Sequence, residues 1–418
     1  MKKYDEYKDT GIDWLPKLPS HWQLEQLRKY IRLVSIKGHP EKQLLSVTRE
    51  QGVIVRDTES KEENHNFIPE DLSGYKYVQK GQFVINKMKS WQGSYGVSEH
   101  EGIVSPAYFV CDLCFPNKKF FSLAIRSRNY VSFFAQYSKG IRVGQWDLSP
   151  IALKSIPFFE PPIAEQEKIV RFIESKTLNI DTYVAERERE LQLLNELKES
   201  EIANVITRGL DPNVKMKDSG IFWQPEVPET WKVTRLKHIL QKLNRKRNPN
   251  DELLVCSNSG EVKKRGESKL GLVANSDEIY QGVKAGDLLI HGMDTWHGAI
   301  AVSEYDGMCT PVVHVCDSSQ NKEFIALYLR NMATQKIFKL ISNGVRQNTS
   351  DFRSWDKLAR IPIALPTLEE QEAIVAYITQ KCNATKSLIT ELESQINFLK
   401  EYKERLIADC VTGQIKVD

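Results

Sequence analysis

Apolar residues recur with a seven-residue period through two long stretches of this 418-residue chain. The first stretch runs from Ile163 to Thr207 and sets two neighbouring lines of residues along a helix. Those lines are mostly apolar for four turns and become polar in places further along. A narrow apolar stripe of this kind predicts a long helix that pairs with another helix. The lines contain Ile163, Gln166, Val170, Ile173, Thr177, Ile180, Val184, Arg187, Leu191, Leu194, Lys198, Glu201 and Val205.

The partner helix is predicted in the same chain. The stretch from Leu368 to Thr412 has the same heptad phase when its numbering is shifted by 205. Literal sequence also recurs, because 165–167 and 370–372 both read Glu-Gln-Glu. At about 1.5 Å per residue, each helix would be roughly 65 Å long. Two such helices packed together are expected to form a rod.

A second repeat precedes each half of the chain. Lys8–Trp14 reads Lys-Asp-Thr-Gly-Ile-Asp-Trp, and Lys217–Trp223 reads Lys-Asp-Ser-Gly-Ile-Phe-Trp. The order is therefore opener, body, helix, opener, body, helix. Because the second opener directly follows the first helix, we expect the N-terminal opener to pack near the end of the second helix.

Each body mixes short alternating apolar runs with Gly, Asn and Ser turns, which predicts small irregular sheets with helices. The bodies align with each other at Gly81, Trp91 and Gly93, which correspond to Gly286, Trp296 and Gly298. The predicted fold class is mixed α/β, with two tandem α/β domains, two long antiparallel coiled-coil helices and a pseudo-two-fold internal repeat. We divide the chain into a first domain at 1–155, a first long helix at 156–210, a second domain at 211–360 and a second long helix at 361–418.

Charge is distributed unevenly although the net charge is only +3. Residues 76–142 carry a net charge of +7 and residues 237–269 of +5, whereas the two heptad stretches carry −4 and −3. Basic bodies suit a polyanionic ligand. No apolar run approaches the ~20 residues of a membrane span, and the charged start and seven scattered cysteines favour a reducing cytoplasm.

Three patterns that could support chemistry are weak. Cys111 and Cys114 have half of a zinc-site spacing, but no second pair follows, so a buried strand cysteine is favoured at Cys111. Asp251 with Glu261 and Lys263 fits a nuclease pattern only loosely. The Pro pair at 161–162 lacks the neighbours of an amino-methyltransferase motif. We therefore predict that the chain is not an enzyme and binds no cofactor or metal.

Two aligned loops are better candidates for function. Met88–Gly93 offers lysines for phosphate and a glutamine that can pair with an adenine edge. Met293–Gly298 offers other polar residues in the same frame. We expect Trp91 and Trp296 to be core residues, and the basic cluster at 242–247 to contact phosphate. The candidate DNA-binding residues are Lys87, Lys89, Ser90, Gln92, Arg142, Asp294, Thr295, His297, Arg346, Gln347 and Asn348.

Together these motifs resemble the specificity subunit of type I restriction-modification systems over nearly the whole chain. The resemblance rests on the repeated opener, the Met-x-x-Trp-x-Gly loops at Met88 and Met293, and the Pro-x₃-Glu-Gln-Glu-x-Ile-Val sequence before each helix. It implies two target-recognition domains that read a bipartite site on double-stranded DNA. It also implies that two methyltransferase subunits and restriction/translocase subunits assemble with the chain. S-adenosylmethionine, ATP and Mg²⁺ would be used by those partners.

Two other classes of function remain open. The chain could be a DNA-modifying enzyme whose active site is not recognisable, or a coiled-coil scaffold without a role on nucleic acid. Methyl transfer by the purified chain would favour the enzyme. Absence of salt-dependent DNA binding in the presence of the methyltransferase would favour the scaffold.

Overall fold

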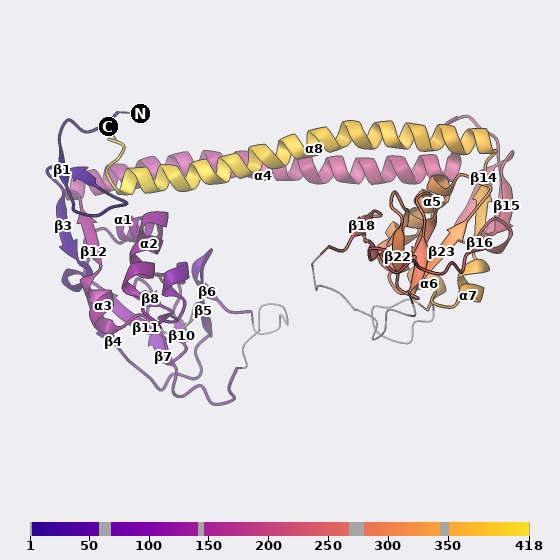
Figure 1. Ribbon diagram of the computed structural model, residues 1–418. Helices are drawn as coiled ribbons and strands as arrows, with labels where there is room; N and C mark the ends of the chain where they lie inside the picture. Colours follow the sequence, from indigo (N-terminus) through magenta and orange to yellow (C-terminus); the bar gives the residue numbers. More distant parts are fainter. Residues whose placement is uncertain (1, 58–67, 141–145, 267–279, 343–350, 418) are drawn as a thin grey trace. The chain divides into compact units, whose positions relative to one another are not determined.

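The computed structural model describes residues 2–57, 68–140, 146–266, 280–342 and 351–417 (Figure 1). The chain divides into two compact units. Unit 1 contains Met1–Glu188 together with Glu393–Asp418, and unit 2 contains Arg189–Leu392. Two long helices, α4 (Ile163–Arg208) and α8 (Leu368–Val411), contribute to both units. The predicted fold class is confirmed, while the four-segment division by residue number stays a prediction.

The heptad seam is present on both long helices. Each seam position after the first is buried or half-buried, including the polar Gln166 and Gln371. The first positions differ, because Ile163 and Leu368 are 50% and 47% exposed. The buried glutamine one turn later instead closes the start of each helix; Gln166 Nε2, for example, donates to the Pro161 carbonyl at 2.7 Å. The seam therefore begins one turn later than the sequence pattern predicts.

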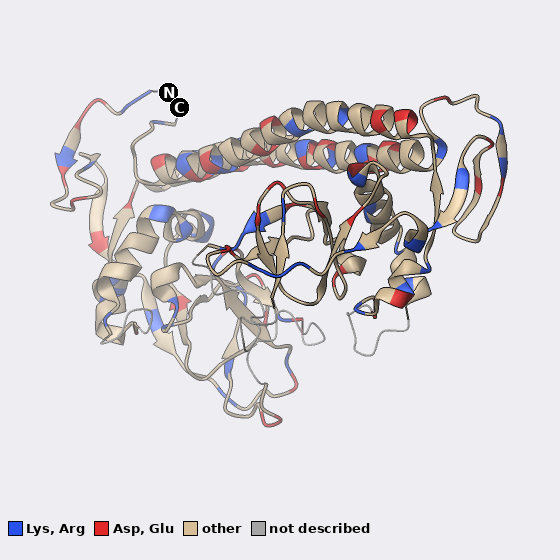
Figure 2. Ribbon diagram, turned by 45° about the vertical axis from the view of Figure 1, so that its right-hand side comes forward, with Lys and Arg blue, Asp and Glu red and all other residues tan. Residues whose placement is uncertain are grey.

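The two helices pack antiparallel within each unit (Figure 1). In unit 1, Lys403 Nζ lies 2.6 Å from Asp181, and Lys400 Nζ lies 2.8 Å from Glu188, so rising numbers on α4 meet falling numbers on α8. In unit 2, Tyr377 Oη donates to Glu201 at 2.5 Å. Figure 2 shows acidic and basic residues interspersed along both helices. In the described part of the chain, no helix is long and apolar enough for a bilayer crossing.

The rest of unit 1 consists of short strands and helices around an aromatic core. Its four-stranded sheet has the order β4-β11-β8-β9, and every pairing in it is antiparallel. The elements of unit 1 before α4 are β1 (Tyr7–Asp9), β2 (Lys17–Pro19), β3 (Gln23–Gln26), η1 (Leu27–Lys29), β4 (Ile31–Val34), β5 (Leu45–Thr48), β6 (Gly52–Val55), β7 (Lys76–Val78), β8 (Phe83–Ile85), η2 (Ser90–Gln92), β9 (Tyr95–Val97), β10 (Gly102–Val104), β11 (Phe109–Leu113), α1 (Lys118–Arg126), α2 (Arg128–Tyr137), α3 (Pro150–Ser155) and β12 (Pro157–Glu160).

Unit 2 repeats this plan with different residues. Its four-stranded sheet has the order β16-β23-β20-β21, which is the same arrangement of the corresponding strands. Its elements before α8 are β13 (Met216–Ile221), β14 (Gln224–Pro228), β15 (Lys232–Arg235), η3 (Leu236–His238), β16 (Gln241–Lys242), β17 (Leu254–Cys256), β18 (Val262–Lys264), β19 (Gln281–Val283), β20 (Leu288–His291), η5 (Thr295–His297), β21 (Ile300–Val302), β22 (Gly307–Cys309), β23 (Val313–Asp317), α5 (Lys322–Thr334), α6 (Ile337–Ile341), α7 (Trp355–Ala359) and β24 (Pro362–Leu365).

The long helices complete the core of each unit. Ile169 and Ile173 of α4 join Leu406 and Cys410 of α8 in the main apolar cluster of unit 1. The core is rich in aromatic rings, and Tyr95 stacks on Phe134 with ring centroids 3.9 Å apart. The other ends of the same helices enter the main cluster of unit 2 through residues such as Ile206, Ile374 and Ile378. Neither unit is therefore complete without parts of both helices.

Each opener forms a hairpin that packs against the end of a long helix. In unit 1, Tyr7 Oη donates to the Gly413 carbonyl at 3.1 Å, and Gln414 Nε2 donates to the Lys17 carbonyl at 3.1 Å. In unit 2, Gln224 Nε2 donates to the Thr207 carbonyl at 3.0 Å. The predicted packing of the N-terminal opener at the end of the second helix is thus confirmed.

The residue that closes each opener is a buried tryptophan. Trp22 and Trp231 are fully buried, and each indole donates to a glutamate in the first turn of a long helix. The distances are 3.1 Å from Trp22 Nε1 to Glu165 Oε2 and 3.0 Å from Trp231 Nε1 to Glu370 Oε1. The buried tryptophan of each repeated opener therefore bonds to the first glutamate of a repeated Glu-Gln-Glu sequence.

Candidate nucleic-acid interface

The two aligned loops have the same backbone form. In unit 1 a turn of 3-10 helix, η2, follows β8 and ends at Gly93, whose φ is +95°. In unit 2 the corresponding turn, η5, ends at Gly298 with a φ of +79°. A positive φ is costly for residues with a side chain, so glycine is needed at both positions. The matched glycines of the sequence thus fix one loop geometry in both units.

Two of the predicted DNA contacts are instead interior residues. Ser90 and Thr295 occupy the same place in the two turns, and both are fully buried. Ser90 Oγ donates to the Lys87 carbonyl at 3.2 Å and lies 3.3 Å from Ser138 Oγ. The prediction that Ser90 and Thr295 contact DNA is corrected, because the first residue of each turn faces the body of its unit and holds the loop in place.

Other predicted residues of the loops remain accessible. Lys89 and His297 are exposed, and Gln92 is half-buried. Lys87 Nζ forms an ion pair with Asp147 at 3.0 Å. These contacts leave Lys89, Gln92 and His297 as the loop side chains best placed to meet a ligand.

Asp294 is tied to a histidine of the preceding strand. Its backbone N–H donates to His291 Nδ1 at 3.0 Å, and its carboxylate lies 3.2 Å from the same nitrogen. Burial lowers the pKa of His291, while the carboxylate of Asp294 opposes that shift. Asp294 thus shapes the loop as well as contributing to its surface.

The tryptophans of the loops were predicted to be core residues, and this prediction is wrong. Trp91 and Trp296 are half-buried. Trp91 packs on Trp146 with ring centroids 5.1 Å apart, and Lys339 Nζ lies 5.8 Å from the ring centroid of Trp296. The second residue of each turn is therefore only partly covered, and Trp296 packs at the margin of the main apolar cluster of unit 2. The predicted residues Arg142, Arg346, Gln347 and Asn348 lie outside the described residues.

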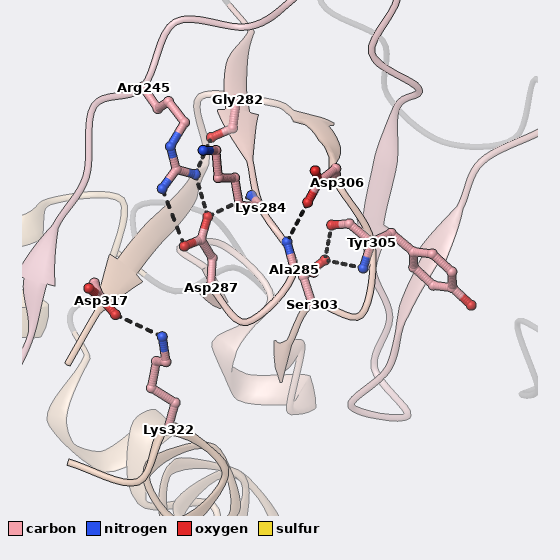
Figure 3. A network of polar contacts seen from close by, with 10 residues as sticks. All are labelled: Arg245, Gly282, Lys284, Ala285, Asp287, Ser303, Tyr305, Asp306, Asp317 and Lys322. Carbon is pink, nitrogen blue, oxygen red and sulfur yellow. Dashed lines mark hydrogen bonds and ion pairs between the residues drawn. The ribbon is translucent and has the colours of Figure 1, made fainter. Parts of the chain in front are cut away.

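One residue of the predicted phosphate-binding cluster at 242–247 instead pairs with a buried carboxylate. Figure 3 shows Arg245 facing Asp287 with both terminal nitrogens, at 2.5 Å and 3.4 Å. Asp287 is 5% exposed and also accepts from the Lys284 backbone N–H at 2.7 Å. This carboxylate raises the pKa of Arg245. Arg245 is therefore a structural cation, and phosphate contact by Lys242, Lys246 and Arg247 stays a prediction.

The cysteine prediction for the first body is confirmed. Cys111 is buried in β11, where burial raises the pKa of its thiol to about 12. Cys114 is exposed beyond the end of the strand. Within the described ranges no group of His, Cys, Asp and Glu side chains has the arrangement of a metal site.

A structural arginine on a helix was missed by the sequence reasoning. Arg126, the last residue of α1, donates to four backbone carbonyls, two in the turn between β5 and β6 and two at Gly93 and Tyr95. Arg330 of α5 occupies the corresponding place, and both helices begin at an asparagine that caps the first turn, Asn117 and Asn321. The signal was available, since Asn and Arg recur at a shift of 204 in both bodies. The identity of the carbonyl partners could not be read from it.

Comparison with known proteins identifies the second unit. The family model described as type I restriction modification DNA specificity domain matches residues 228–397. Residues 228–397 correspond to a type I specificity domain. The family resemblance predicted from the repeated motifs is therefore confirmed. The matched range contains the whole four-stranded sheet of unit 2 and the loop with η5.

Two solved structures match most of the length of the chain. A chain from a structure titled "Structural basis underlying complex assembly and conformational transition of the type I R-M system" matches with a TM-score of 0.69 at 14% identity, covering 96% of this chain and 100% of that chain. The HsdS subunit from Thermoanaerobacter tengcongensis matches with a TM-score of 0.48 at 15% identity, covering 96% and 98%. No curated protein sequence matches the chain.

Proposed function

We propose that the chain is the non-catalytic specificity subunit of a type I restriction-modification complex and reads a bipartite DNA site. One observation carries this proposal. The sheet that lies inside the matched specificity domain of unit 2 recurs in unit 1 with the same strand order and the same glycine-closed loop. Two domains of one form, with different exposed residues at equivalent positions, suit the recognition of two different half-sites.

The difference between the loops supports separate half-sites. Lys89 and Gln92 of unit 1 offer a cation and an amide, whereas Asp294 and His297 of unit 2 offer a carboxylate and an imidazole. These groups suit different base edges in the major groove. Basic residues of both bodies would supply sequence-independent affinity, so binding would weaken as salt is raised.

The residues that could have formed a nuclease site have other contacts. Asp251 accepts from the backbone N–H and the side-chain amide of Asn248, at 2.7 Å and 3.2 Å. Glu261 pairs with Lys263 at 2.8 Å on an exposed hairpin. These contacts support a role in recognition without chemistry. Methyl transfer and cleavage, with S-adenosylmethionine, ATP and Mg²⁺, are assigned in this proposal to partner subunits, and the assembly to the cytoplasm.

A repeated apolar edge on the long helices supports docking of two methyltransferase subunits. In unit 1, Tyr183, Phe398 and Tyr402 are 41%, 68% and 39% exposed. The two tyrosines each precede a seam residue, and Phe398 lies one turn before Tyr402. In an antiparallel pair of helices these three positions lie on the same edge. Glu188 and Lys400 each follow a seam residue and lie on the opposite edge, where they pair at 2.8 Å.

Unit 2 has the same apolar edge at the positions related by the shift of 205. Leu388 corresponds to Tyr183, Leu193 to Phe398, and Leu197 to Tyr402, and all three leucines are at least half exposed. Exposed apolar side chains grouped on one edge favour burial against another protein. Because each unit has one such edge, the chain suits two copies of one partner. Restriction/translocase subunits would join through surfaces of their own.

Methylome sequencing tests the recognition proposal. A host that expresses the chain with a methyltransferase subunit should acquire methylation at one split sequence with two fixed half-sites. Exchanging 22–155 for the body of a related chain should alter one half-site and leave the other unchanged. Methyl transfer by this chain alone would overturn the proposal in favour of an enzyme. Absence of salt-dependent DNA binding by the assembled complex would overturn it in favour of a scaffold.

Native mass spectrometry tests the docking edges. The wild-type chain should bind two methyltransferase subunits, and either Phe398→Asp with Tyr402→Asp or Leu193→Asp with Leu197→Asp should reduce the number to one. Lys400→Ala, on the opposite edge, is the matched control and should retain two. Retention of both partners by a chain that carries all four aspartates would show that docking lies elsewhere.

A further inference from the structure

Each unit has a β-hairpin whose exposed turn lies beside the glycine-closed loop. In unit 1 the hairpin of β5 and β6 exposes Arg49, Glu50 and Gln51. In unit 2 the hairpin of β17 and β18 exposes Asn258, Ser259 and Glu261. Neither turn was predicted from the sequence to bind DNA, although Glu261 belongs to the weak nuclease pattern.

The contact between turn and loop is close in both units. A Cβ built on Gly93 would lie 4.0 Å from Arg49 Cγ, and one built on Gly298 would lie 3.5 Å from the Asn258 carbonyl oxygen. In unit 1 the hairpin also approaches β9, where a Cβ on Gly96 would lie 3.3 Å from the Cα of Gly52. The hairpin turn and the loop therefore form one continuous piece of surface in each unit.

An arginine fixes the hairpin turn of unit 1. The guanidinium of Arg126 donates through Nη2 to the carbonyls of Arg49 and Glu50, at 2.8 Å and 2.7 Å. Through Nη1 it donates to the carbonyls of Gly93 and Tyr95, at 3.1 Å and 2.8 Å. One side chain thus joins the hairpin turn to the end of the loop. Four bonds from a planar group define both position and orientation.

The arginine of unit 2 also contacts its hairpin turn. Arg330 Nη2 donates to the Ser259 carbonyl at 2.8 Å. The turn approaches the guanidinium so closely that a Cβ on Gly260 would lie 2.1 Å from Arg330 Cζ. Gly260 also has a φ of +75°, so glycine is needed there for both space and backbone conformation. In each unit an arginine at the equivalent position of the equivalent helix, α1 or α5, holds the hairpin turn.

The side chains of the turns are of the types that read bases. Arginine recognises guanine, glutamine and asparagine recognise adenine, and glutamate accepts from cytosine. A two-stranded hairpin fits the major groove of B-form DNA. The supporting frame is shared between the units, whereas the exposed side chains differ. This is the pattern required of a surface that has one position and two sequence preferences.

We propose that the turns Arg49–Gln51 and Ser257–Glu261 are specificity-determining DNA contacts, and that Arg126 and Arg330 are the positioning residues that hold these turns in place. This inference rests on the proposed function of the chain as a DNA specificity subunit. It adds a second reading element to each unit and assigns each element to one half-site.

Turn variants in the assembled methyltransferase complex test the proposal. Replacing Arg49, Glu50 and Gln51 by alanine should relax or change one half-site in the methylome and leave the other intact. Replacing Asn258, Ser259 and Glu261 by alanine should have the reciprocal effect. The matched control replaces Glu99, His100 and Glu101, three exposed residues of the turn between β9 and β10, and should leave both half-sites unchanged.

The positioning role has its own readout. Arg126→Lys retains a cation but cannot donate to four carbonyls, so the half-site of unit 1 should become less specific. The ratio of methylated to unmethylated copies of its single-base variants should rise by at least about 10-fold. Arg330→Lys removes the planar group that packs against Gly260 and donates to the Ser259 carbonyl, and should relax the other half-site. Thermal unfolding measured on the same proteins separates loss of positioning from loss of the fold.

The outcomes distinguish this inference from the proposed function. If the wild-type complex methylates a split site and the turn variants retain both half-sites at full efficiency, the hairpins do not read DNA and only this inference is overturned. If the wild-type complex shows no split site, the proposed function itself is overturned. A half-site change on the wrong side of the split sequence would contradict the assignment of turns to half-sites.

Discussion

Units 1 and 2 place different buried polar residues at one equivalent position before β8 and β20. In unit 1 this residue is Gln82, whose Oε1 accepts from the Gln79 backbone N–H at 2.8 Å. In unit 2 it is Asp287, whose carboxylate accepts from the backbone N–H of Lys284 at 2.7 Å. Both side chains therefore satisfy the same backbone donor of the same tight turn, and both are almost fully buried.

The remaining contacts of these two residues differ. The amide of Gln82 donates to Asp112 Oδ1 at 2.8 Å, so a neutral group meets a surface carboxylate. The carboxylate of Asp287 requires a cation, which Arg245 supplies from the segment after β16. The framework thus demands one acceptor oxygen at this position and tolerates either chemistry around it. Divergence between the units is permitted wherever each new polar group finds a partner.

The largest expected effect is at the shared tryptophans. Trp22→Ala and Trp231→Ala should each reduce the free energy of unfolding of their own unit by about 3–5 kcal/mol, because a fully buried indole leaves a large cavity. Urea denaturation followed by hydrogen exchange, which resolves the units, measures both. Equal losses would support equivalent openers. A loss confined to one unit would show that only one opener contributes to stability.

Conservative changes at the same tryptophans should separate the units. Glu165 accepts from Trp22 and Tyr4 and lies 2.9 Å from His21, whereas Trp231 is the side-chain donor found for Glu370 among the described residues. Trp231→Phe should therefore destabilise unit 2 more than Trp22→Phe destabilises unit 1, by about 1 kcal/mol. Equal effects of the two phenylalanines would refute this difference.

The polar position before β8 and β20 comes next in size. Asp287→Ala leaves the partly buried Arg245 without its carboxylate and should cost about 2 kcal/mol, whereas Gln82→Ala removes neutral hydrogen bonds and should cost about 1 kcal/mol. Chemical denaturation of the two variants measures the difference. Replacing Arg245 and Asp287 together should cost less than the sum of the two single changes. Additive losses would argue against the pair.

A smaller effect should appear when the pH is lowered. Burial lowers the pKa of both His291 and His314 below the ordinary value of 6.5. His314 Nε2 lies 2.8 Å from the Phe352 carbonyl oxygen, and its buried Nδ1 has no hydrogen-bond partner among the residues that the structure describes. The unfolded chain consequently binds more protons than the folded chain below about pH 6.5. The free energy of unfolding of unit 2 should therefore fall as the pH drops through that value.

Unit 1 provides the control for this pH effect. The positions equivalent to His291 and His314 hold Asn86 and Phe109, which do not titrate. Hydrogen exchange at β20 and β23, corrected for intrinsic rates, should accelerate between about pH 7.5 and 5.5 relative to β8 and β11. The double variant His291→Asn with His314→Phe should remove the difference. Persistence of the difference in that variant would exclude the histidines as its cause.

The smallest effect is expected on the helix surface. Lys400 and Glu188 are both about half exposed, so solvent screens their ion pair. Lys400→Ala should change the free energy of unfolding of unit 1 by no more than about 0.5 kcal/mol. Thermal unfolding at low and high salt measures it. A loss several times larger would mean that the ion pair between Lys400 and Glu188 is a major source of the stability of the helix pair.

The sequence predicts the framework because its signals are periodic or repeated. The seam was recognisable from residues such as Val184 and Leu392, since apolar residues recur every seven positions when a long helix buries one narrow stripe. The openers were recognisable because Trp22 and Trp231 recur in the same short motif. The prediction was wrong at the helix starts, where the apolar Ile163 and Leu368 are about half exposed.

The candidate site was predicted less well. Ser90 and Lys89 are both polar, and only the path of the 3-10 turn decides that Ser90 is buried while Lys89 is exposed. Arg245 is as basic as Arg247 in sequence, but its pairing with Asp287 depends on a contact across 42 positions of the chain. The contact between Arg126 and the hairpin turn was not predicted, because Arg126 donates to backbone carbonyls. Every residue has a backbone carbonyl, so no side-chain pattern marks the acceptors.

The division into units has a consequence for the order of events during synthesis. Unit 2 is continuous along the chain, so all of its residues have been made once Leu392 has left the ribosome. Unit 1 begins first but needs Leu406 and Cys410 to cover Ile169 and Ile173. Contacts of such long sequence separation form late. A late stop codon would therefore release a chain whose second unit is folded and whose first unit exposes apolar residues to proteases.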